Sequence, residues 1–263
     1  MSKKLGLALG SGGARGVAHA GLLKALEEQG IKPYCIAGCS MGAVVGGVYS
    51  SGVDAQSLYE IVKGIKKRDI VVINPAALSQ MSLLRSGKVF ELLREHLAAK
   101  NIEDFPIKFS CVATDILSGK MHVFDRGDAA LAIQASSTIP AVFAPVKFED
   151  RLFIDGGCTC RVPFRTVKEM GADVVIAMDV LKNCSQPVEE VHGIINVVLR
   201  AFDIMDAQNA RLLYERDGKL CDLLLEPEMT GMSQYAVKEL DRAFEEGYLI
   251  TKKNMDKIKS LLD

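Results

Sequence analysis

Residues 36–48 read Ile-Ala-Gly-Cys-Ser-Met-Gly-Ala-Val-Val-Gly-Gly-Val, and the five residues centred on Ser40 have the G-x-S-x-G spacing of a nucleophile elbow. In such a turn a short strand passes abruptly into a helix, and the central residue adopts a strained conformation. The apolar run 34–37 suits a buried strand, and the small apolar residues 41–51 suit a helix packed under a sheet. The spacing therefore predicts that Ser40 stands exposed at the tip of a strand-to-helix turn.

The glycines on either side of Ser40 leave two interpretations open. In a nucleophile elbow, Gly38 and Gly42 let the strand and the helix approach without a clash between β-carbons. The same five-residue pattern also occurs in Gly/Ser turns that only pack a helix against a sheet. A serine hydroxyl becomes a good nucleophile only when a positioned base takes its proton, so the choice depends on residues elsewhere in the chain.

A glycine-rich loop precedes this turn. The apolar run 5–9 predicts a strand, which leads directly into Gly10-Ser-Gly-Gly-Ala-Arg-Gly16. Residues 17–29 have helical periodicity and end at Gly30, which suits a helix C-cap. A loop between a strand and a helix leaves backbone N–H groups unpaired at the helix N-terminus, where they can hold an anion.

Three kinds of anion compete for these amides: a dinucleotide, a nucleotide phosphate and the oxyanion of an acyl-transfer intermediate. The dinucleotide fingerprint needs its third glycine where Arg15 stands, and the Gly-Lys-Ser/Thr of a P-loop is absent. An oxyanion hole remains, and it needs a nucleophile nearby. Because neighbouring parallel strands end at the same edge of a sheet, we expect the loop and Ser40 to lie together at that edge.

The rest of the chain alternates between strand and helix patterns without an internal repeat or a linker. This alternation predicts one three-layer α/β/α sandwich with a mainly parallel central sheet, in a single domain over residues 1–263. Strands 106–114 and 121–124 are expected to form a hairpin. The other predicted strands are 152–154, 172–179 and 220–225, the predicted helices are 54–67, 87–98, 128–136, 163–170, 188–216 and 233–262, and loops are expected at 69–86 and 137–146.

The sequence offers four histidines as bases for Ser40. His192 alone lies far enough along the chain for the Ser, acid, His order of α/β-hydrolases, but it sits early in an amphipathic segment, where a surface or capping role is expected. His19 follows the glycine loop by one helical turn and is expected to pack there, whereas His96 and His122 have no supporting context. A hydrolase with His192 as its base stays an alternative.

A carboxylate is the other candidate base. Asp155 follows the predicted strand 152–154 in an Asp-Gly-Gly turn, beside the uncharged segment 136–146. Its ordinary pKa is about 3.9, so it serves as a base only if burial leaves it poorly solvated or if the oxyanion hole supplies most of the rate. Arg151 and Arg161 would oppose this if they approached it. Asp-Gly-Gly is also a common turn sequence, so a purely structural interpretation exists.

The charge balance and the cysteines argue against several classes of protein. Lysine and arginine number 32 against 33 aspartates and glutamates, and the net charge of -1 gives no basic field for nucleic acid or anionic lipid. The seven cysteines are odd in number and scattered, and no signal peptide is visible, which predicts reduced thiols in a cytoplasmic protein. Cys158-x-Cys160 lacks a second Cys/His pair at ligand spacing, so no zinc site is expected.

Three motifs thus occur in one order: the glycine loop 10–16, Gly38-Cys-Ser-Met-Gly42, and Asp155-Gly-Gly157. Together they resemble the patatin-like phospholipase family, most closely its short bacterial members. Ala135-Ser-Ser-Thr-Ile-Pro140, before Phe143-Ala-Pro145, and Pro163 after the Asp-Gly-Gly turn are similar to the family too. The resemblance covers roughly residues 4–179 and, more faintly, the rest of the chain.

The resemblance implies a serine acyl hydrolase with a Ser-Asp dyad, in which Ser40 is the nucleophile and Asp155 the base. The backbone amides of Gly12 and Gly13 would form the oxyanion hole, and Arg15 would brace the loop rather than contact substrate. The implied substrates are carboxylic esters of lipids, such as phospholipids or lysophospholipids, and no metal or other cofactor is implied.

The chain departs from the family pattern after the Asp-Gly-Gly turn. Members often carry Asn before the following proline, whereas this chain has Cys158-Thr-Cys-Arg161, which concerns the hydrogen bonding around Asp155. Cys39 lies beside Ser40, but an elbow turns the neighbours of its central residue away. A catalytically weak lipid-binding or regulatory protein of the same fold is the alternative, although every catalytic position is filled.

The substrate side of the site is predicted only in outline. The apolar segments 78–84 and 139–146 are expected to line an acyl pocket. Phospholipase, lysophospholipase, thioesterase and general esterase activities all fit, and no oligomeric state is predicted. Lipid substrates are compatible with transient contact with a membrane surface, although no amphipathic anchor stands out among the predicted helices.

Overall fold

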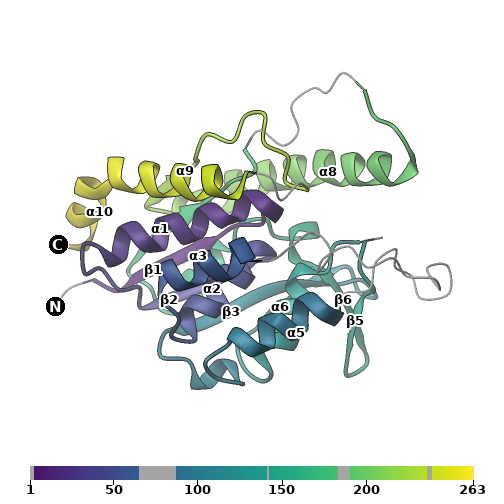
Figure 1. Ribbon diagram of the computed structural model, residues 1–263, viewed down its shortest axis with the longest axis horizontal. Helices are drawn as coiled ribbons and strands as arrows, with labels where there is room; N and C mark the ends of the chain where they lie inside the picture. The colour runs from purple at the N-terminus through teal and green to yellow at the C-terminus, as the bar shows by residue number, and fades with distance from the viewer. Residues whose placement is uncertain (1–2, 65–86, 141, 183–189, 236–238) are drawn as a thin grey trace.

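The computed structural model describes residues 3–64, 87–140, 142–182, 190–235 and 239–263 (Figure 1). Its described strands form one eight-stranded sheet in the order β5-β6-β3-β2-β1-β7-β8, with β4 paired to β3. The strands are β1 (Leu5–Leu9), β2 (Cys35–Cys39), β3 (Lys108–Asp115), β4 (Lys120–Phe124), β5 (Val146–Phe148), β6 (Arg151–Asp155), β7 (Val174–Met178) and β8 (Leu223–Leu225).

The sheet is parallel at its centre and antiparallel on one side. β1 pairs in parallel with β2 and with β7, β2 with β3, and β7 with β8. β4 and β6 pair antiparallel with β3, and β5 pairs antiparallel with β6. The mainly parallel sheet and the β3–β4 hairpin are therefore confirmed.

β2 and β6 share one edge of β3. β2 pairs with residues 108–112 of β3 and β6 with residues 113–115, while β4 occupies the opposite edge over residues 111–115. Because β2 is parallel and β6 antiparallel to β3, the two strands point toward each other and their carboxyl ends meet. The residues at this junction are Ser40, which follows β2, and Asp155, which ends β6.

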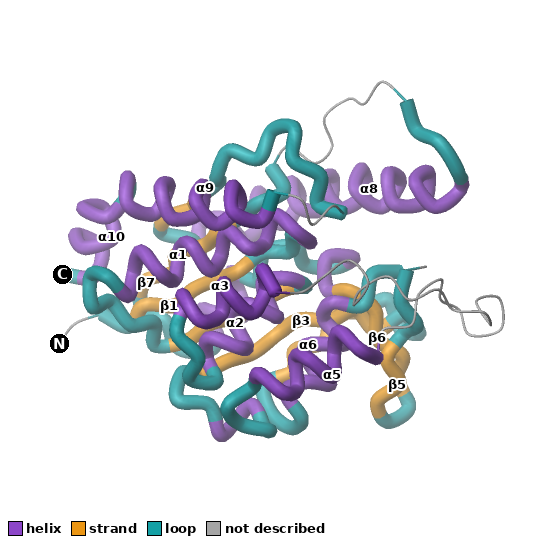
Figure 2. The backbone as a smooth tube through the Cα atoms, viewed as in Figure 1, coloured by secondary structure: helices purple, strands orange, loops and turns teal. Residues whose placement is uncertain are grey.

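Helices cover both faces of the sheet, which confirms the three-layer sandwich (Figures 1 and 2). One face carries α1, α2, α3 and α6, with α9 packed along α1 and α5 beside α6, and the other face carries α7 and the end of α8. The helices are α1 (Ala18–Glu27), α2 (Met41–Ser50), α3 (Ala55–Gly64), α5 (Gly87–His96), α6 (Ala129–Ser137), α7 (Phe164–Glu169), α8 (Ile194–Asp217), α9 (Leu240–Lys253) and α10 (Met255–Leu262).

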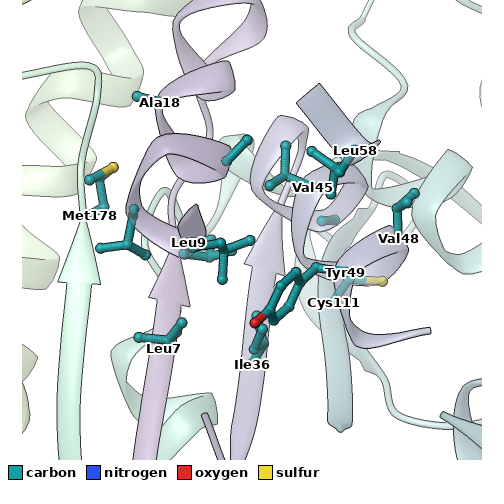
Figure 3. Packing of buried hydrophobic residues seen from close by; sticks show 14 of the residues in the cluster. Leu7, Leu9, Ala18, Ile36, Val45, Val48, Tyr49, Leu58, Cys111 and Met178 are labelled. Carbon is teal, nitrogen blue, oxygen red and sulfur yellow. The ribbon is translucent and has the colours of Figure 1, made fainter. Parts of the chain in front are cut away.

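The alternation of side chains along the strands gives each face its own core. Leu7 and Leu9 of β1 pack with Ile36 of β2 beneath the helices α2 and α3, where Val45 and Leu58 complete the cluster (Figure 3). The residues between them on the strands, Ala8 and Ala37 among others, point to the opposite face and pack against α7. Burial on both faces explains why these strands are continuously apolar in the sequence.

The structure corrects several predicted boundaries. The helix expected from residue 188 begins at Ile194, after Gly193 at φ 80°. β5, which begins at the last residue of the expected loop 137–146, was not predicted, because charged residues at 147, 149 and 150 interrupt the apolar pattern of its hairpin with β6. The expected loop 69–86, and with it the segment 78–84 assigned to an acyl pocket, lies outside the described residues.

The predicted helix 233–262 was wrong in its first part. Gln234 and Tyr235 lie in a turn, where Asp203 of α8 accepts hydrogen bonds from both side chains. The helical pattern resumes as α9 and is interrupted at Asn254 before α10. Tertiary contacts with α8 have thus overridden a local helical preference in this segment.

Among the described helices, none combines the length and the apolar composition that crossing a lipid bilayer requires.

The packing of α9 on α1 generates a stability prediction. A β-carbon built on Gly247 of α9 would lie 2.0 Å from the carbonyl oxygen of Ala18, so the two backbones are in direct contact. We expect Gly247→Ala to lower the free energy of unfolding by about 1–3 kcal/mol through overpacking, despite the higher helix propensity of alanine. Urea unfolding measures this. Gly64→Ala is the control, because no atom of the residues that the structure describes lies within 4 Å of its built β-carbon. Equal losses of stability in both variants would contradict the packing argument.

Candidate active site

Ser40 connects β2 to α2 in a strained conformation. Its φ of 53° and ψ of -121° lie in a region that residues with a β-carbon rarely adopt, and Glu149 is the other described non-glycine residue with positive φ. A β-carbon on Gly42 would lie 2.2 Å from the carbonyl oxygen of Leu9. The turn therefore has the local geometry of a nucleophile elbow, pressed against the end of β1.

Ser40 is buried rather than exposed, with 5% of its surface accessible. This corrects the prediction that it stands at an open tip. Its backbone N–H donates to Ser136 Oγ of α6 over 3.0 Å, and its hydroxyl faces the end of β6. The elbow is covered because α6 and β6 converge on it from the antiparallel side of the sheet.

The structure brings Ser40 and Asp155 into direct contact. Ser40 Oγ donates a hydrogen bond of 2.6 Å to Asp155 Oδ2, and Asp155 Oδ1 accepts one of 2.8 Å from the backbone N–H of Gly157. Only 2% of the surface of Asp155 is accessible. One carboxylate oxygen is thus held by the Asp-Gly-Gly turn, and the other is directed at the serine hydroxyl.

Burial raises the pKa of Asp155 from 3.8 to about 6, because removal from water disfavours the charged carboxylate. The hydrogen bonds from Ser40 and Gly157 lower this pKa, and the nearby charge of Asp206 raises it. The arginines that could have opposed the shift are engaged elsewhere: Arg161 pairs with Asp206 over 2.6 Å, and Arg151 contacts His122. Asp155 consequently has the basicity of a weak general base near neutral pH.

Three further residues hold this pair, and pattern analysis did not assign them roles. Ser136 Oγ, which accepts from Ser40, donates to the carbonyl oxygen of Val112 over 2.7 Å. The N–H of Asp155 donates to the carbonyl of Thr138, and Thr114 Oγ1 donates to the carbonyl of Asp155 over 3.0 Å. Ser136 and Thr138 fall in the segment 135–140 that resembles the family, and this is the one sequence signal that pointed to them.

Backbone hydrogen bonds hold the glycine loop on either side of Gly12 and Gly13. The N–H of Ser11 donates to the carbonyl of Arg161, and the N–H of Ala14 to the carbonyl of Gln234, each over 2.9 Å. Between them, the amides of Gly12 and Gly13 donate to no acceptor in the described part of the chain. Two adjacent unpaired donors are what an oxyanion hole requires.

The loop lies directly against the elbow and the Asp-Gly-Gly turn. A β-carbon on Gly16 would lie 2.5 Å from the side chain of Met41, and one on Gly157 would lie 3.3 Å from Ser11 Oγ. Arg15 is buried, and its guanidinium donates to the carbonyls of Met232, at 2.8 and 2.5 Å, and of Val180. These contacts direct Arg15 into the protein, as a brace for the loop.

None of the four histidines, all of which the structure describes, hydrogen-bonds to Ser40. His192 is exposed and lies 2.7 Å from Glu190. His19 is buried, and burial lowers its pKa to about 4, so its neutral ring donates from Nε2 to the carbonyl of Gly10 over 2.8 Å. His19 therefore supports the backbone of the glycine loop, and His192 lies in solvent.

The last two features of the site are the thiol of Cys39, beside Ser40, and the side chains that could bind a metal ion. Cys39 is buried, and burial followed by the charge of Asp155 raises the pKa of its thiol well above the ordinary value, which keeps it protonated and a poor nucleophile. Within the described residues, no group of three or more His, Cys, Asp and Glu side chains is arranged to hold a metal ion.

A family model described as patatin-like phospholipase matches residues 7–168. An uncharacterised NTE family protein of Mycobacterium tuberculosis is 41% identical over 177 residues, which are 67% of this chain and 49% of that protein. The lysophospholipase NTE1 of Candida albicans is 30% identical over 182 residues, which are 68% of this chain and 13% of that protein.

A solved structure agrees on the fold. VipD of Legionella pneumophila superposes with a TM-score of 0.60 over 97% of this chain and 67% of that one, at 14% sequence identity. The chain spans about half the length of the mycobacterial relatives. Since the family model covers most of the chain, including both glycine motifs and Asp155, this protein belongs to the patatin-like phospholipase family.

Proposed function

We propose that this protein is a lipid acyl hydrolase that cleaves carboxylic esters with Ser40 as nucleophile and Asp155 as general base. The observation that carries the proposal is the buried hydrogen bond of 2.6 Å between Ser40 Oγ and Asp155 Oδ2. The chain belongs to a phospholipase family and is 30% identical in sequence to a lysophospholipase, and both facts support a lipid ester as the substrate. No metal or cofactor takes part in the proposed chemistry.

In the proposed first step, Asp155 Oδ2 takes the proton of Ser40 as Oγ attacks the ester carbonyl carbon. The carbonyl oxygen becomes an oxyanion and accepts hydrogen bonds from the free amides of Gly12 and Gly13. The intermediate then collapses, the bond to the leaving alcohol breaks, and Asp155 returns its proton to that alcohol. Asp155 then takes a proton from a water molecule as the water attacks the carbonyl carbon of the acyl-serine. The bond to Ser40 Oγ breaks, the acid is released, and Asp155 returns the proton to Ser40.

The two carboxylate oxygens of Asp155 have different roles in this mechanism. Oδ1 is occupied by the Gly157 amide, which fixes the carboxylate plane, and Oδ2 alone faces the reacting hydroxyl. Because the pKa of Asp155 is raised to about 6, the carboxylate is still ionised at neutral pH but holds a proton better than an exposed aspartate would. A histidine is not needed to relay the proton.

Removal of either member of the dyad should abolish turnover. We expect Ser40→Ala and Asp155→Ala to lower kcat/KM for a p-nitrophenyl ester by about 10³-fold or more, since nucleophile and base act as a unit. Ser40→Ala should also lose labelling by a fluorophosphonate probe, with the label mapped by mass spectrometry. His192→Ala is the matched control and should keep full activity. Undiminished turnover in Ser40→Ala, or loss of activity in His192→Ala, would overturn the assignment. Wild-type protein with neither turnover nor labelling would favour a binding or regulatory role.

The pH dependence of hydrolysis follows from the raised pKa of Asp155. The base must be ionised in the free enzyme, so kcat/KM should be constant above about pH 7 and fall about tenfold per pH unit below about pH 6. Rates with a p-nitrophenyl ester over this range measure the inflection. An acid limb near 4 would instead describe an exposed, unperturbed aspartate.

Ionisation of Asp155 should lower the free energy of unfolding of the protein. The folded-state pKa of Asp155, about 6, exceeds its unfolded value of 3.8, so the stability from protonated Asp155 is complete below about pH 4 and is lost as the pH rises through 6. Asp155→Asn should therefore be more stable than the wild type at about pH 8, by up to roughly 3 kcal/mol, and the gap should close toward pH 4. Urea unfolding of both proteins between about pH 4 and 8 measures this difference in the free energy of unfolding. A difference that does not change with pH would show that Asp155 does not titrate as described.

A further inference from the structure

Helix α8 lies outside the family-matched residues 7–168 and buries two carboxylates beside the site. Asp203 and Asp206 are 8% and 5% accessible, and their spacing of three residues places them on one face of the helix. Burial of a carboxylate is unfavourable unless hydrogen bonds compensate it. Each of the two is hydrogen-bonded to the side chain of a residue whose backbone carbonyl accepts an N–H of the glycine loop.

Asp206 is linked through Arg161 to the N-terminal side of the glycine loop. Its Oδ2 accepts hydrogen bonds from Nε and Nη2 of Arg161, at 2.8 and 2.6 Å. Asp179, at the end of β7, and the carbonyl of Leu181 contact Nη1 of the same guanidinium. With its side chain held in this way, the carbonyl of Arg161 accepts the N–H of Ser11, immediately before Gly12.

Arg161 carries a buried guanidinium, with 3% of the residue surface accessible. A neutral side chain there would need no buried anions around it, whereas a guanidinium does, because an unpaired buried charge is strongly destabilising. Asp206 and Asp179 supply this compensation from two different elements. The buried charge of Arg161 is thus balanced by carboxylates from two distant parts of the chain.

Asp203 acts on the other side of the loop through Gln234. Its Oδ1 accepts hydrogen bonds from Gln234 Nε2 at 2.7 Å and from the hydroxyl of Tyr235 at 2.5 Å. The carbonyl of Gln234 accepts the N–H of Ala14, immediately after Gly13. A β-carbon on Gly13, which has a φ of 50°, would lie 2.2 Å from that carbonyl oxygen, so loop and segment are in close contact.

We propose that Asp203 and Asp206 are positioning residues that hold the two sides of the oxyanion loop, so that α8 sets the direction of the Gly12 and Gly13 amides. The inference rests on the proposed function, because it assigns these amides to the oxyanion. Donors stabilise a developing charge only when they are fixed before the reaction, and a displacement near 1 Å is enough to lower the rate about 100-fold. Neither aspartate contacts the reacting atoms, so substrate binding should change little.

The decisive experiment measures kcat and KM of full-length variants with a p-nitrophenyl ester, alongside their thermal unfolding. Asp203→Leu removes the acceptor of Gln234 and should lower kcat about 10- to 100-fold with KM within about twofold of the wild type. Asp203→Asn keeps an acceptor for the neutral donors of Gln234 and Tyr235 and should restore most of the activity. Asp206→Asn should lose about tenfold in kcat, because a neutral amide holds the guanidinium of Arg161 less strongly.

Asp217→Asn is the matched control on the same helix. Asp217 is a buried carboxylate paired with Arg165 and Arg216, without a link to the glycine loop. This variant should lose stability while keeping the wild-type kcat, which separates positioning from a general loss of stability. If Asp203→Leu does not fold, Gln234→Met removes the same hydrogen bond from a partly exposed position and should show the same loss of kcat.

The outcomes distinguish this inference from the proposed function. An inactive wild type that a fluorophosphonate does not label would overturn both. An active, labelled wild type with an unchanged kcat in folded Asp203→Leu or Gln234→Met would overturn the positioning role alone. An equal loss of kcat in Asp217→Asn would also overturn it, since the effect would then follow stability rather than the loop.

Discussion

The buried hydrogen bond between Ser40 and Asp155 is the contact on which the arrangement of this site depends. It exists because two strands meet end to end along one edge of β3, one parallel and one antiparallel to it. A carboxylate placed at that junction is out of water and becomes more basic, while the serine beside it is held in a strained turn. Both perturbations are unfavourable by themselves, so the surrounding core must stabilise them.

The family-matched region contains Ser40, Asp155 and the unpaired amides of Gly12 and Gly13, but residues beyond it also contact the glycine loop. The loop that carries Gly12 and Gly13 is anchored through Arg15 to the carbonyl of Met232 and through Ala14 to that of Gln234, both beyond residue 168. Asp203 of α8 accepts a hydrogen bond from Gln234, and Asp206 of α8 accepts hydrogen bonds from Arg161, whose carbonyl accepts the N–H of Ser11. The last third of the chain is therefore in direct contact with the glycine loop, although it lies beyond the residues that the family model matches.

The buried cations near the site are engaged by partners other than Asp155. Arg15 is surrounded by backbone carbonyls, and Arg161 is paired with Asp206 and Asp179. The buried His19 is neutral at physiological pH because burial lowers its pKa to about 4. With the cations engaged in this way, burial remains the main influence on the pKa of Asp155, which it raises to about 6.

The sequence by itself determined the elements and their class: the strand, glycine loop and helix at 5–29, the elbow around Ser40, and the alternation that specifies a layered α/β sandwich. These are local properties of glycine spacing and apolar periodicity. Only the tertiary structure decided that Ser40 is buried, that its hydroxyl meets a carboxylate 115 residues away, and that carboxylates of α8 bond to the two residues whose carbonyls accept N–H groups of the glycine loop. The reason is physical, since burial and long-range hydrogen bonds arise from how elements pack, and no local pattern of residues specifies which distant side chain will complete a buried polar group.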